Sequence, residues 1–180
     1  MATTIIKYTL SGEFEPFQPQ EGVIYSAFEK EVDIACYMGD VEYTIASMLM
    51  KSPHKNIVTV NSIINIVNDI HVISFEFLDL HKEKDATVIE AMTAALHHLH
   101  GHGVVYVDLH IHNIGWSYKD NCWKLFDFNM CGILKTEYKW YKKPIKGFML
   151  TSYKKLKYEK GTRTLFDIDM FALAQLEASL

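Results

Sequence analysis

The feature that most constrains the fold of this chain is a helix with clear start and stop signals that leads directly into a short apolar strand. Thr87 and Glu90 have the spacing of a capping box, in which both side chains satisfy free backbone N–H groups. Apolar residues at helical spacing share one face: Ile89, Met92, Leu96 and Leu99. Gly101 and Gly103 end the helix, and the strand VVYV begins at Val104. This succession predicts a mixed fold.

β-rich segments lie on both sides of this helix. Residues 22–38 indicate two β-rich runs joined by a charged turn at Glu29–Glu31, and residues 40–50 indicate a helix. Three more β-rich runs fill residues 56–80, with a hairpin turn at Asn68-Asp69. Downstream come a polar turn, two further β runs and a final helical segment. This order is typical of an α+β fold rather than of alternating βαβ units.

Composition excludes several other classes. The chain has 180 residues, 49% of them hydrophobic and 22% charged, which fits one globular domain or two small lobes. No apolar run reaches the ~18 residues that span a bilayer, and the N-terminus lacks the pattern of a signal peptide. Three cysteines without CxxC spacing predict free thiols in a reducing compartment. We therefore expect an intracellular, cytoplasmic protein without a membrane partner.

Charge is distributed unevenly along the chain, although the net charge is only -4. Residues 135–160 contain nine lysines and two glutamates, a net charge of +7, interleaved with aromatic residues. Such a segment could meet an acidic or phosphorylated partner or a nucleic acid, or it could be a solvated lysine-rich loop. Residues 1–134 carry eight lysines and seventeen acidic residues, a net charge of -9.

Residues 102–134 carry the pattern that points to a chemistry. Asn113 follows Asp108-Leu109 at a five-residue step from Asp108, and Asp127-Phe128 begins nineteen residues after Asp108. This segment resembles the catalytic segment of protein kinases, H-R-D-L-x-x-x-N followed by D-F-G. The resemblance implies that Asp108 orients the attacking hydroxyl group. It also implies that Asn113 and Asp127 bind Mg²⁺, with Mn²⁺ as an alternative ion.

Other segments follow the order of the same family. Gly22 is similar to the last glycine of the nucleotide-binding loop, and Phe75, Glu76 and Phe77 resemble the hinge, with Phe75 as gatekeeper. The resemblance therefore assigns ATP to these four residues. Residues 167–172 look like the start of the family's helix F.

The resemblance implies a two-lobe protein-kinase-like fold. A small β-rich N-lobe would occupy residues 1–79, and a truncated, mainly helical C-lobe would occupy residues 80–180 and end near helix F. A truncated lobe is expected to expose apolar surface on its final helix, which would favour a partner or a homo-oligomer. The residues concerned are Phe166, Met170, Phe171, Leu173 and Leu176.

Several phosphate-binding residues of the family are missing. Phe17 and Pro19 occupy the places of two loop glycines, which hinders close backbone approach to phosphates. The strand expected to present the phosphate-pairing lysine is interpreted as Val32–Tyr37, so that Cys36 or Tyr37 takes the lysine's place. Lys30 or Lys51 could reach in instead. Glu42 lies on the following helix, about one turn from the place of the usual glutamate partner.

The catalytic loop also departs from the family pattern. Tyr106 and Val107 replace His-Arg, and the loss of the Arg argues against control by loop phosphorylation. His110 replaces the usual Lys, as in the aminoglycoside-phosphotransferase-like branch, and could contact a phosphoryl oxygen when protonated. Asn129 replaces the Gly of D-F-G, and Asn tolerates a left-handed backbone well.

Two readings outside the kinase superfamily stay open. Asp108, His110 and His112 also match the D-x-H-x-H opening of metal-dependent hydrolases, because alternate residues of a strand share a face. The simpler alternative is an α+β domain in which Asp108 and Asp127 only cap turns.

Within the kinase-like reading, two hypotheses compete. The first is a minimal phosphotransferase with weak or atypical ATP binding, which acts on protein Ser/Thr or, as a lesser alternative, on a small molecule. The second is a pseudokinase without ATP or metal, a binding module that mimics or inhibits a partner kinase. Compact chains of this kind resemble proteins of large DNA viruses, which would place the protein in the host cytoplasm.

Overall fold

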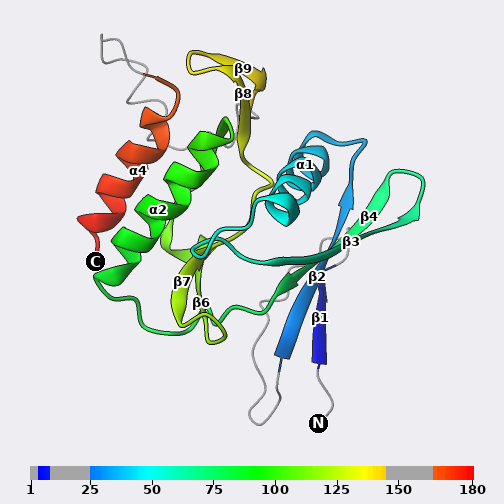
Figure 1. Cartoon of the computed structure of the whole chain (residues 1–180), viewed down its shortest axis with the longest axis horizontal. Helices are drawn as coiled ribbons and strands as arrows, with labels where there is room; N and C mark the ends of the chain where they lie inside the picture. Colours follow the sequence, from blue (N-terminus) through cyan, green and yellow to red (C-terminus); the bar gives the residue numbers. More distant parts are fainter. Residues whose placement is uncertain (1–3, 9–24, 145–163) are drawn as a thin grey trace. The chain divides into compact units, whose positions relative to one another are not determined.

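The computed structural model describes residues 4–8, 25–144 and 164–180. Within these residues the fold is mixed α+β, with three α-helices and small sheets. The chain divides into two compact units (Figure 1). Unit 1 comprises Met1–Pro53 and Thr59–Phe77, and unit 2 comprises His54–Val58 and Leu78–Leu180. None of the helices in the described residues is long and apolar enough to cross a membrane.

In its described residues, unit 1 is a sheet with one helix packed against it. The sheet order is β1-β2-β4-β3, with β1 parallel to β2 and the other neighbours antiparallel. The strands are β1 (Thr4–Tyr8), β2 (Tyr25–Asp33), β3 (Val60–Val67) and β4 (Ile70–Glu76). The helix α1 (Tyr37–Lys51) contacts β2, β3 and β4 and buries one apolar side: Val41, Ile45, Ala46 and Leu49.

The end of β2 differs from the sequence prediction. β2 runs without a break through Glu29–Glu31, where we predicted a turn, and it ends at Asp33. Asp33 itself forms the turn, because its carboxylate accepts the N–H of Ala35 at 2.9 Å and its carbonyl oxygen accepts that of Cys36 at 3.2 Å. Cys36 then caps α1, since its sulfur accepts the N–H of Gly39. The predicted strand Val32–Tyr37 is therefore wrong beyond Asp33.

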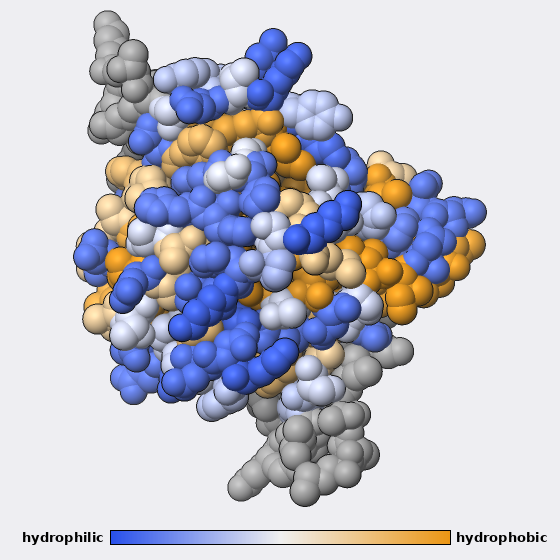
Figure 2. All heavy atoms as spheres, viewed as in Figure 1, coloured by the Kyte–Doolittle hydropathy of each residue, from blue (hydrophilic) through white to orange (hydrophobic). Residues whose placement is uncertain are grey.

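The β3–β4 hairpin confirms the predicted turn at Asn68-Asp69, where Asn68 has a positive φ of 48°. Its projecting end is apolar and exposed: Ile64 is 53% exposed, Ile66 58% and Val67 54%. Figure 2 shows hydrophobic surface over this hairpin, beside hydrophilic residues. β3 forms the outer strand of the sheet in the described part of unit 1.

The described residues of unit 2 form two α-helices, a two-stranded hairpin and a three-stranded sheet. The helices are α2 (Thr87–Gly101) and α4 (Asp167–Glu177), which contact each other. The hairpin is formed by β6 (Ile114–Ser117) and β7 (Cys122–Leu125). The sheet has the order β5-β8-β9, from β5 (Val104–Val105), β8 (Gly132–Thr136) and β9 (Lys139–Lys142).

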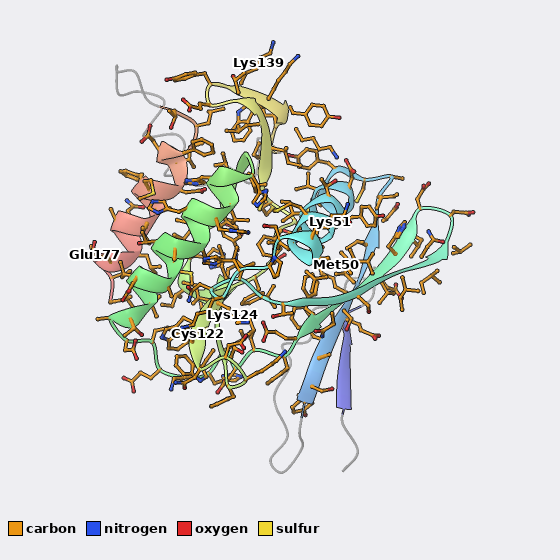
Figure 3. The ribbon with its side chains drawn as sticks, in the orientation of Figure 1. Met50, Lys51, Cys122, Lys124, Lys139 and Glu177 are labelled. Carbon is orange, nitrogen blue, oxygen red and sulfur yellow. The ribbon has the colours of Figure 1, made fainter. Side chains whose placement is uncertain are left out.

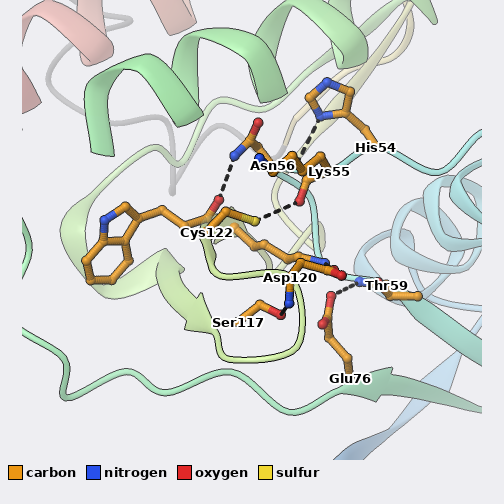
Figure 4. A network of polar contacts seen from close by, with 10 residues as sticks. His54, Lys55, Asn56, Thr59, Glu76, Ser117, Asp120 and Cys122 are labelled. Carbon is orange, nitrogen blue, oxygen red and sulfur yellow. Dashed lines mark hydrogen bonds and ion pairs between the residues drawn. The ribbon is translucent and has the colours of Figure 1, made fainter. Parts of the chain in front are cut away.

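A network of polar contacts joins residues 54–58 to β7, which explains why this short segment belongs to unit 2. The N–H of Val58 donates to the carbonyl oxygen of Leu125 at 2.9 Å, and the N–H of Leu125 donates to that of Asn56. The Asn56 amide also donates to the carbonyl oxygen of Trp123 at 3.0 Å (Figure 4). The thiol of Cys122 contacts the carbonyl oxygen of Lys55.

The two helices of unit 2 differ from prediction at particular residues. α2 begins at Thr87 as predicted, but the capping box is wrong, because the carboxylate of Asp85 accepts the N–H of Thr87 at 3.0 Å. On α4, the prediction of an exposed apolar face is wrong for Leu173 and Leu176, which are each 6% exposed. The contact between α2 and α4 covers that side of the helix.

Candidate functional site

The candidate site is built on the loop between β5 and β6. A 3-10 turn, η1 (Ile111–Asn113), returns the chain so that the Asn113 amide donates to Asp108 twice. One bond reaches the Asp108 carbonyl oxygen at 3.0 Å and the other reaches its Oδ2 at 3.1 Å. The backbone of Asn113 is held as well, because its carbonyl oxygen accepts the N–H of Phe126 at 3.1 Å. The five-residue step predicted as functional therefore closes a loop around the Asp108 carboxylate.

His110 belongs to the same group. Its Nε2 lies 3.4 Å from Oδ2 of Asp108, and its Nδ1 is buried without a hydrogen-bond partner among the described residues. The hydrogen bond to Asp108 raises the pKa of His110; burial opposes this effect, and the charges of Asp108 and Asp127 add to it. A raised pKa favours the imidazolium form near neutral pH.

Asp127 lies within electrostatic reach of the same residues. Its charge contributes to the raised pKa of His110. Burial raises the pKa of Tyr106 well above its usual value, and the charges of Cys131, Asp127 and Asp108 add to this rise. The Tyr106 hydroxyl donates to the carbonyl oxygen of Phe126, which fixes the residue before Asp127. The carboxylates of Asp108 and Asp127 therefore both act on His110 and on Tyr106.

The backbone around Asp127 has an unusual conformation. Asp127 has a φ of 61°, whereas Asn129, where we expected a residue tolerant of the left-handed region, does not have a positive φ. The ring of the next residue, Phe128, is fully buried and lies edge-on to Tyr106, with 6.0 Å between the ring centroids. Tyr106 thus holds the chain on both sides of Asp127, through its hydrogen bond to Phe126 and its ring contact with Phe128.

A buried carboxylate of α4 holds the start of the loop between β5 and β6. Asp169 is fully buried, and it accepts the N–H of Tyr106 at 2.8 Å and that of Val107 at 2.7 Å. His100 of α2 contacts the same carboxylate at 2.8 Å. Val107 has a φ of 72°, which is strained for a β-branched residue and persists only where its surroundings enforce it. The two hydrogen bonds that Asp169 accepts hold the backbone of Val107 in this conformation.

The donor atoms of this group suit a hard divalent cation. Carboxylate and amide oxygens are the ligands that Mg²⁺ prefers. The Asn113 amide nitrogen is directed at Asp108, and the other atom of the amide group is an oxygen of the kind that Mg²⁺ prefers. In the part of the chain that the structure describes, no group of three or more His, Cys, Asp or Glu residues could hold a metal ion. The candidate ligands named above are Asp108, Asp127 and Asn113, which include only two residues of those four types.

Searches of protein-family models and of curated proteins found no match to this chain. The resemblance to protein kinases therefore rests on the residues described above.

Unit 1 contains a lysine–glutamate pair that the sequence reading did not assign. Nζ of Lys30, on β2, lies 2.6 Å from Oε2 of Glu42, on α1, and the Glu42 side chain is only 2% exposed. We had placed Cys36 or Tyr37 where the family has its phosphate-pairing lysine, and this placement is wrong because both residues lie at the start of α1. Lys30, on a strand, is the lysine that pairs with Glu42 on the following helix.

The predicted ATP-binding residues have different surroundings. Gly22 lies outside the described residues. Phe75 and Glu76 are buried on β4, at 2% and 5% exposure, and Oε1 of Glu76 accepts the N–H of Thr59 at 2.7 Å (Figure 4). Phe77 stacks on Tyr25 with 5.3 Å between the ring centroids. The three described residues of this set, Phe75, Glu76 and Phe77, belong to unit 1.

The metal-dependent hydrolase reading loses its geometric basis. It required His110 and His112 on one face of a strand, but His112 lies in the 3-10 turn and is exposed. The two ring centroids are 5.8 Å apart at an angle of 62°. His110 and His112 are therefore not alternate residues of one strand, which was the arrangement expected to give a pair of imidazole ligands.

Sequence reasoning also missed Asp169 as a residue that orders the loop. The segment 167–172 was assigned only by resemblance. A signal was nevertheless present, because Asp169 stands between the apolar residues Ile168 and Met170, and a carboxylate is costly to bury unless several donors satisfy it.

Proposed function

We propose that this chain is a minimal phosphotransferase of the protein-kinase type, with a two-lobe arrangement, that transfers the γ-phosphoryl group of ATP to a Ser or Thr hydroxyl of a protein. The observation that carries the proposal is the hydrogen-bonded group of Asp108, His110 and Asn113, with Asp127 acting on the same histidine. A domain that only capped turns with Asp108 and Asp127 would not need this convergence.

In the proposed mechanism, Asp108 orients the acceptor hydroxyl and takes its proton as the oxygen attacks phosphorus. The hydrogen bonds from Asn113 hold the Asp108 carboxylate in one orientation for this role. His110 in its imidazolium form donates a hydrogen bond to a phosphoryl oxygen, for which the buried Nδ1 is the candidate atom. Asp127 and Asn113 would hold Mg²⁺ or Mn²⁺, which neutralises charge on the phosphates when bound.

Lys30 strengthens the phosphotransferase proposal over the pseudokinase alternative. The absence of a phosphate-pairing lysine was the main argument for a binding module without nucleotide. Lys30 paired with Glu42 has the residue types and elements that the family uses, a strand lysine and a helix glutamate. We therefore assign Lys30 to the phosphates of ATP. Phe17 and Pro19, which lie outside the described residues, stand in the sequence where the family has glycines, and this favours weak or atypical ATP binding.

Nucleotide binding is tested by thermal unfolding with ATP and Mg²⁺, ATP and Mn²⁺, and ATP with a chelator. Ligand at 100 times its dissociation constant would add about 2.7 kcal/mol to the unfolding free energy. We expect a metal-dependent rise that Asp127→Asn abolishes and that Asp167→Asn, a carboxylate on the first turn of α4, leaves in place. An unchanged melting temperature in all three conditions would leave the pseudokinase reading ahead.

Transfer is tested with radiolabelled γ-phosphate on a Ser/Thr-rich protein and on an aminoglycoside as the small-molecule alternative. Lys30→Met is expected to lower the rate by about 10²- to 10³-fold, the loss of one preorganised charge contact. Lys51→Met is the matched control, because Lys51 is exposed at the end of α1. Equal incorporation by the native chain and by Asp108→Asn would remove Asp108 from the catalytic role.

A further inference from the structure

The β8–β9 hairpin of unit 2 has two chemically different faces. Trp140 lies on the inner face, where its ring covers Gly132 so closely that a Cβ at Gly132 would meet Cζ3 at 2.1 Å. Trp140 and its strand partner Leu134 pack against a buried cluster of Val105, Val107 and Ile168. This inner face anchors the hairpin, and the opposite face is turned to solvent.

The outer face is basic and aromatic. Lys139 and Tyr141 flank Trp140 on β9, so strand alternation turns both to the side opposite the core. Tyr141 is 70% exposed and Tyr138, at the turn, is 65% exposed. Figure 3 shows Lys139 projecting away from the body of unit 2. Tyrosines this exposed contribute almost nothing to the core.

The charge of the hairpin is strongly positive. Residues 132–144 contain four lysines and one glutamate, a net charge of +3, in a protein whose net charge is -4. Lys135, Lys139 and Lys143 are exposed. The hairpin therefore attracts polyanions, in contrast to the acidic remainder of the chain.

We propose that the outer face of the β8–β9 hairpin binds single-stranded nucleic acid. Lysines that contact phosphates, combined with aromatic rings on which unpaired bases stack, are the chemistry by which proteins hold single strands without sequence preference. Duplex bases are already stacked on one another and offer no ring face to Tyr138 or Tyr141. An acidic peptide would use the lysines and gain little from two exposed rings. This binding needs no ATP and is independent of the proposed phosphotransfer.

The test is fluorescence anisotropy with the full chain, without nucleotide, and a labelled 15-mer of oligo(dT). A duplex of the same length and a polyglutamate peptide of the same charge are the comparison ligands. We expect oligo(dT) to bind most tightly. Tyr141→Ala should weaken its binding about 5- to 150-fold, the range for loss of a stacking aromatic, and Tyr141→Phe should retain it.

Tyr118→Ala is the matched control for stacking, because Tyr118 is also 70% exposed but lies on the β6–β7 turn, where its hydroxyl donates to Asp79. For charge, Lys139→Gln should reduce the slope of log affinity against log salt by about 0.7, the value for one phosphate contact on a single strand. Lys119→Gln, beside Tyr118, should leave that slope unchanged.

Three outcomes would overturn the proposal. One is the absence of oligo(dT) binding at low salt. The second is equal binding by Tyr141→Ala, Tyr138→Ala and the native chain, which would show that the rings are not used. The third is polyglutamate binding as tight as that of oligo(dT), which would favour an acidic protein partner. Circular dichroism of each variant checks that these exposed substitutions leave the fold intact.

Discussion

Asp169 contacts three donors with one buried carboxylate: the N–H groups of Tyr106 and Val107 and the ring of His100. It receives two backbone N–H groups, and Asp169→Asn replaces one accepting oxygen by an amide that donates. One buried N–H is then left without an acceptor, which costs about 1–3 kcal/mol. We expect Asp169→Asn to lower the unfolding free energy by this amount in urea denaturation.

Asp167→Asn is the control for this change, because Asp167 is on the same first helical turn and its carboxylate lies 3.4 Å from the hydroxyl of Thr164. It should change stability by less than about 0.5 kcal/mol. Equal losses in the two variants would mean that the cost comes from removing negative charge at the start of α4. The hydrogen bonds to the loop would then not be its source.

His110 gives a prediction that depends on pH. Because its hydrogen bond to Asp108 raises its pKa, the imidazolium form stabilises the fold at pH values below the unfolded pKa of about 6.5. This contribution is lost as the pH rises through the higher folded pKa. Asp108→Asn removes the carboxylate and should lower the pKa of His110, as followed by the ring resonances in an NMR titration.

Glu137→Gln is the control for the titration, since Glu137 is an exposed residue of the β8–β9 turn. It should leave the His110 titration unchanged. An unchanged His110 pKa in Asp108→Asn would show that the 3.4 Å contact does not persist in solution.

At the scale of elements, two helix glycines give predictions of opposite sign. A Cβ at Gly39 of α1 would lie 2.1 Å from the carbonyl oxygen of Asp33, a backbone atom that cannot move aside easily. Gly39→Ala should therefore destabilise the protein by about 1–3 kcal/mol, the usual cost of overpacking. Gly101 of α2 has nothing within 4 Å of its notional Cβ, so Gly101→Ala should stabilise by up to about 1 kcal/mol. Thermal unfolding of both variants checks the signs, and a stabilised Gly39→Ala would contradict the close approach.

The same elements show what local pattern predicts. The periodicity of apolar residues located α1 and α2, and the residue pair Asn68-Asp69 located the hairpin turn, because these features depend on neighbours in the sequence. The end of β2 could not be read in this way. Val32–Tyr37 is mostly apolar, as a strand can be, but Asp33 accepts the backbone N–H groups of Ala35 and Cys36 and ends the strand. The hydrogen bond from the N–H of Ala35 to the Asp33 carboxylate, two residues away, helps to end β2 at Asp33.

At the scale of the whole molecule, contacts distant in sequence limited the prediction of the site. Asp108, His110 and Asn113 lie within six residues, and their spacing was enough to predict the group. The link from Asp169 to Tyr106 spans 63 residues, and no local pattern reports it. Lys30 and Glu42 were both noted in the sequence but not paired. Their pairing depends on where β2 ends, and that boundary was misplaced.

Self-association is the last property of the whole molecule that the structure predicts. Residues 59–68 contain no charged side chain, and this stretch includes the outer strand β3 with its exposed Ile64 and Ile66. A neutral outer strand offers unpaired backbone groups to a second copy without charge repulsion. Ile66→Lys should reduce association at high concentration in analytical ultracentrifugation and leave stability within about 0.5 kcal/mol. Met50→Lys adds the same charge at an exposed residue of α1 outside this stretch and should not reduce association. If Met170→Lys on α4 reduced association and Ile66→Lys did not, the contact would run through the final helix and not through β3.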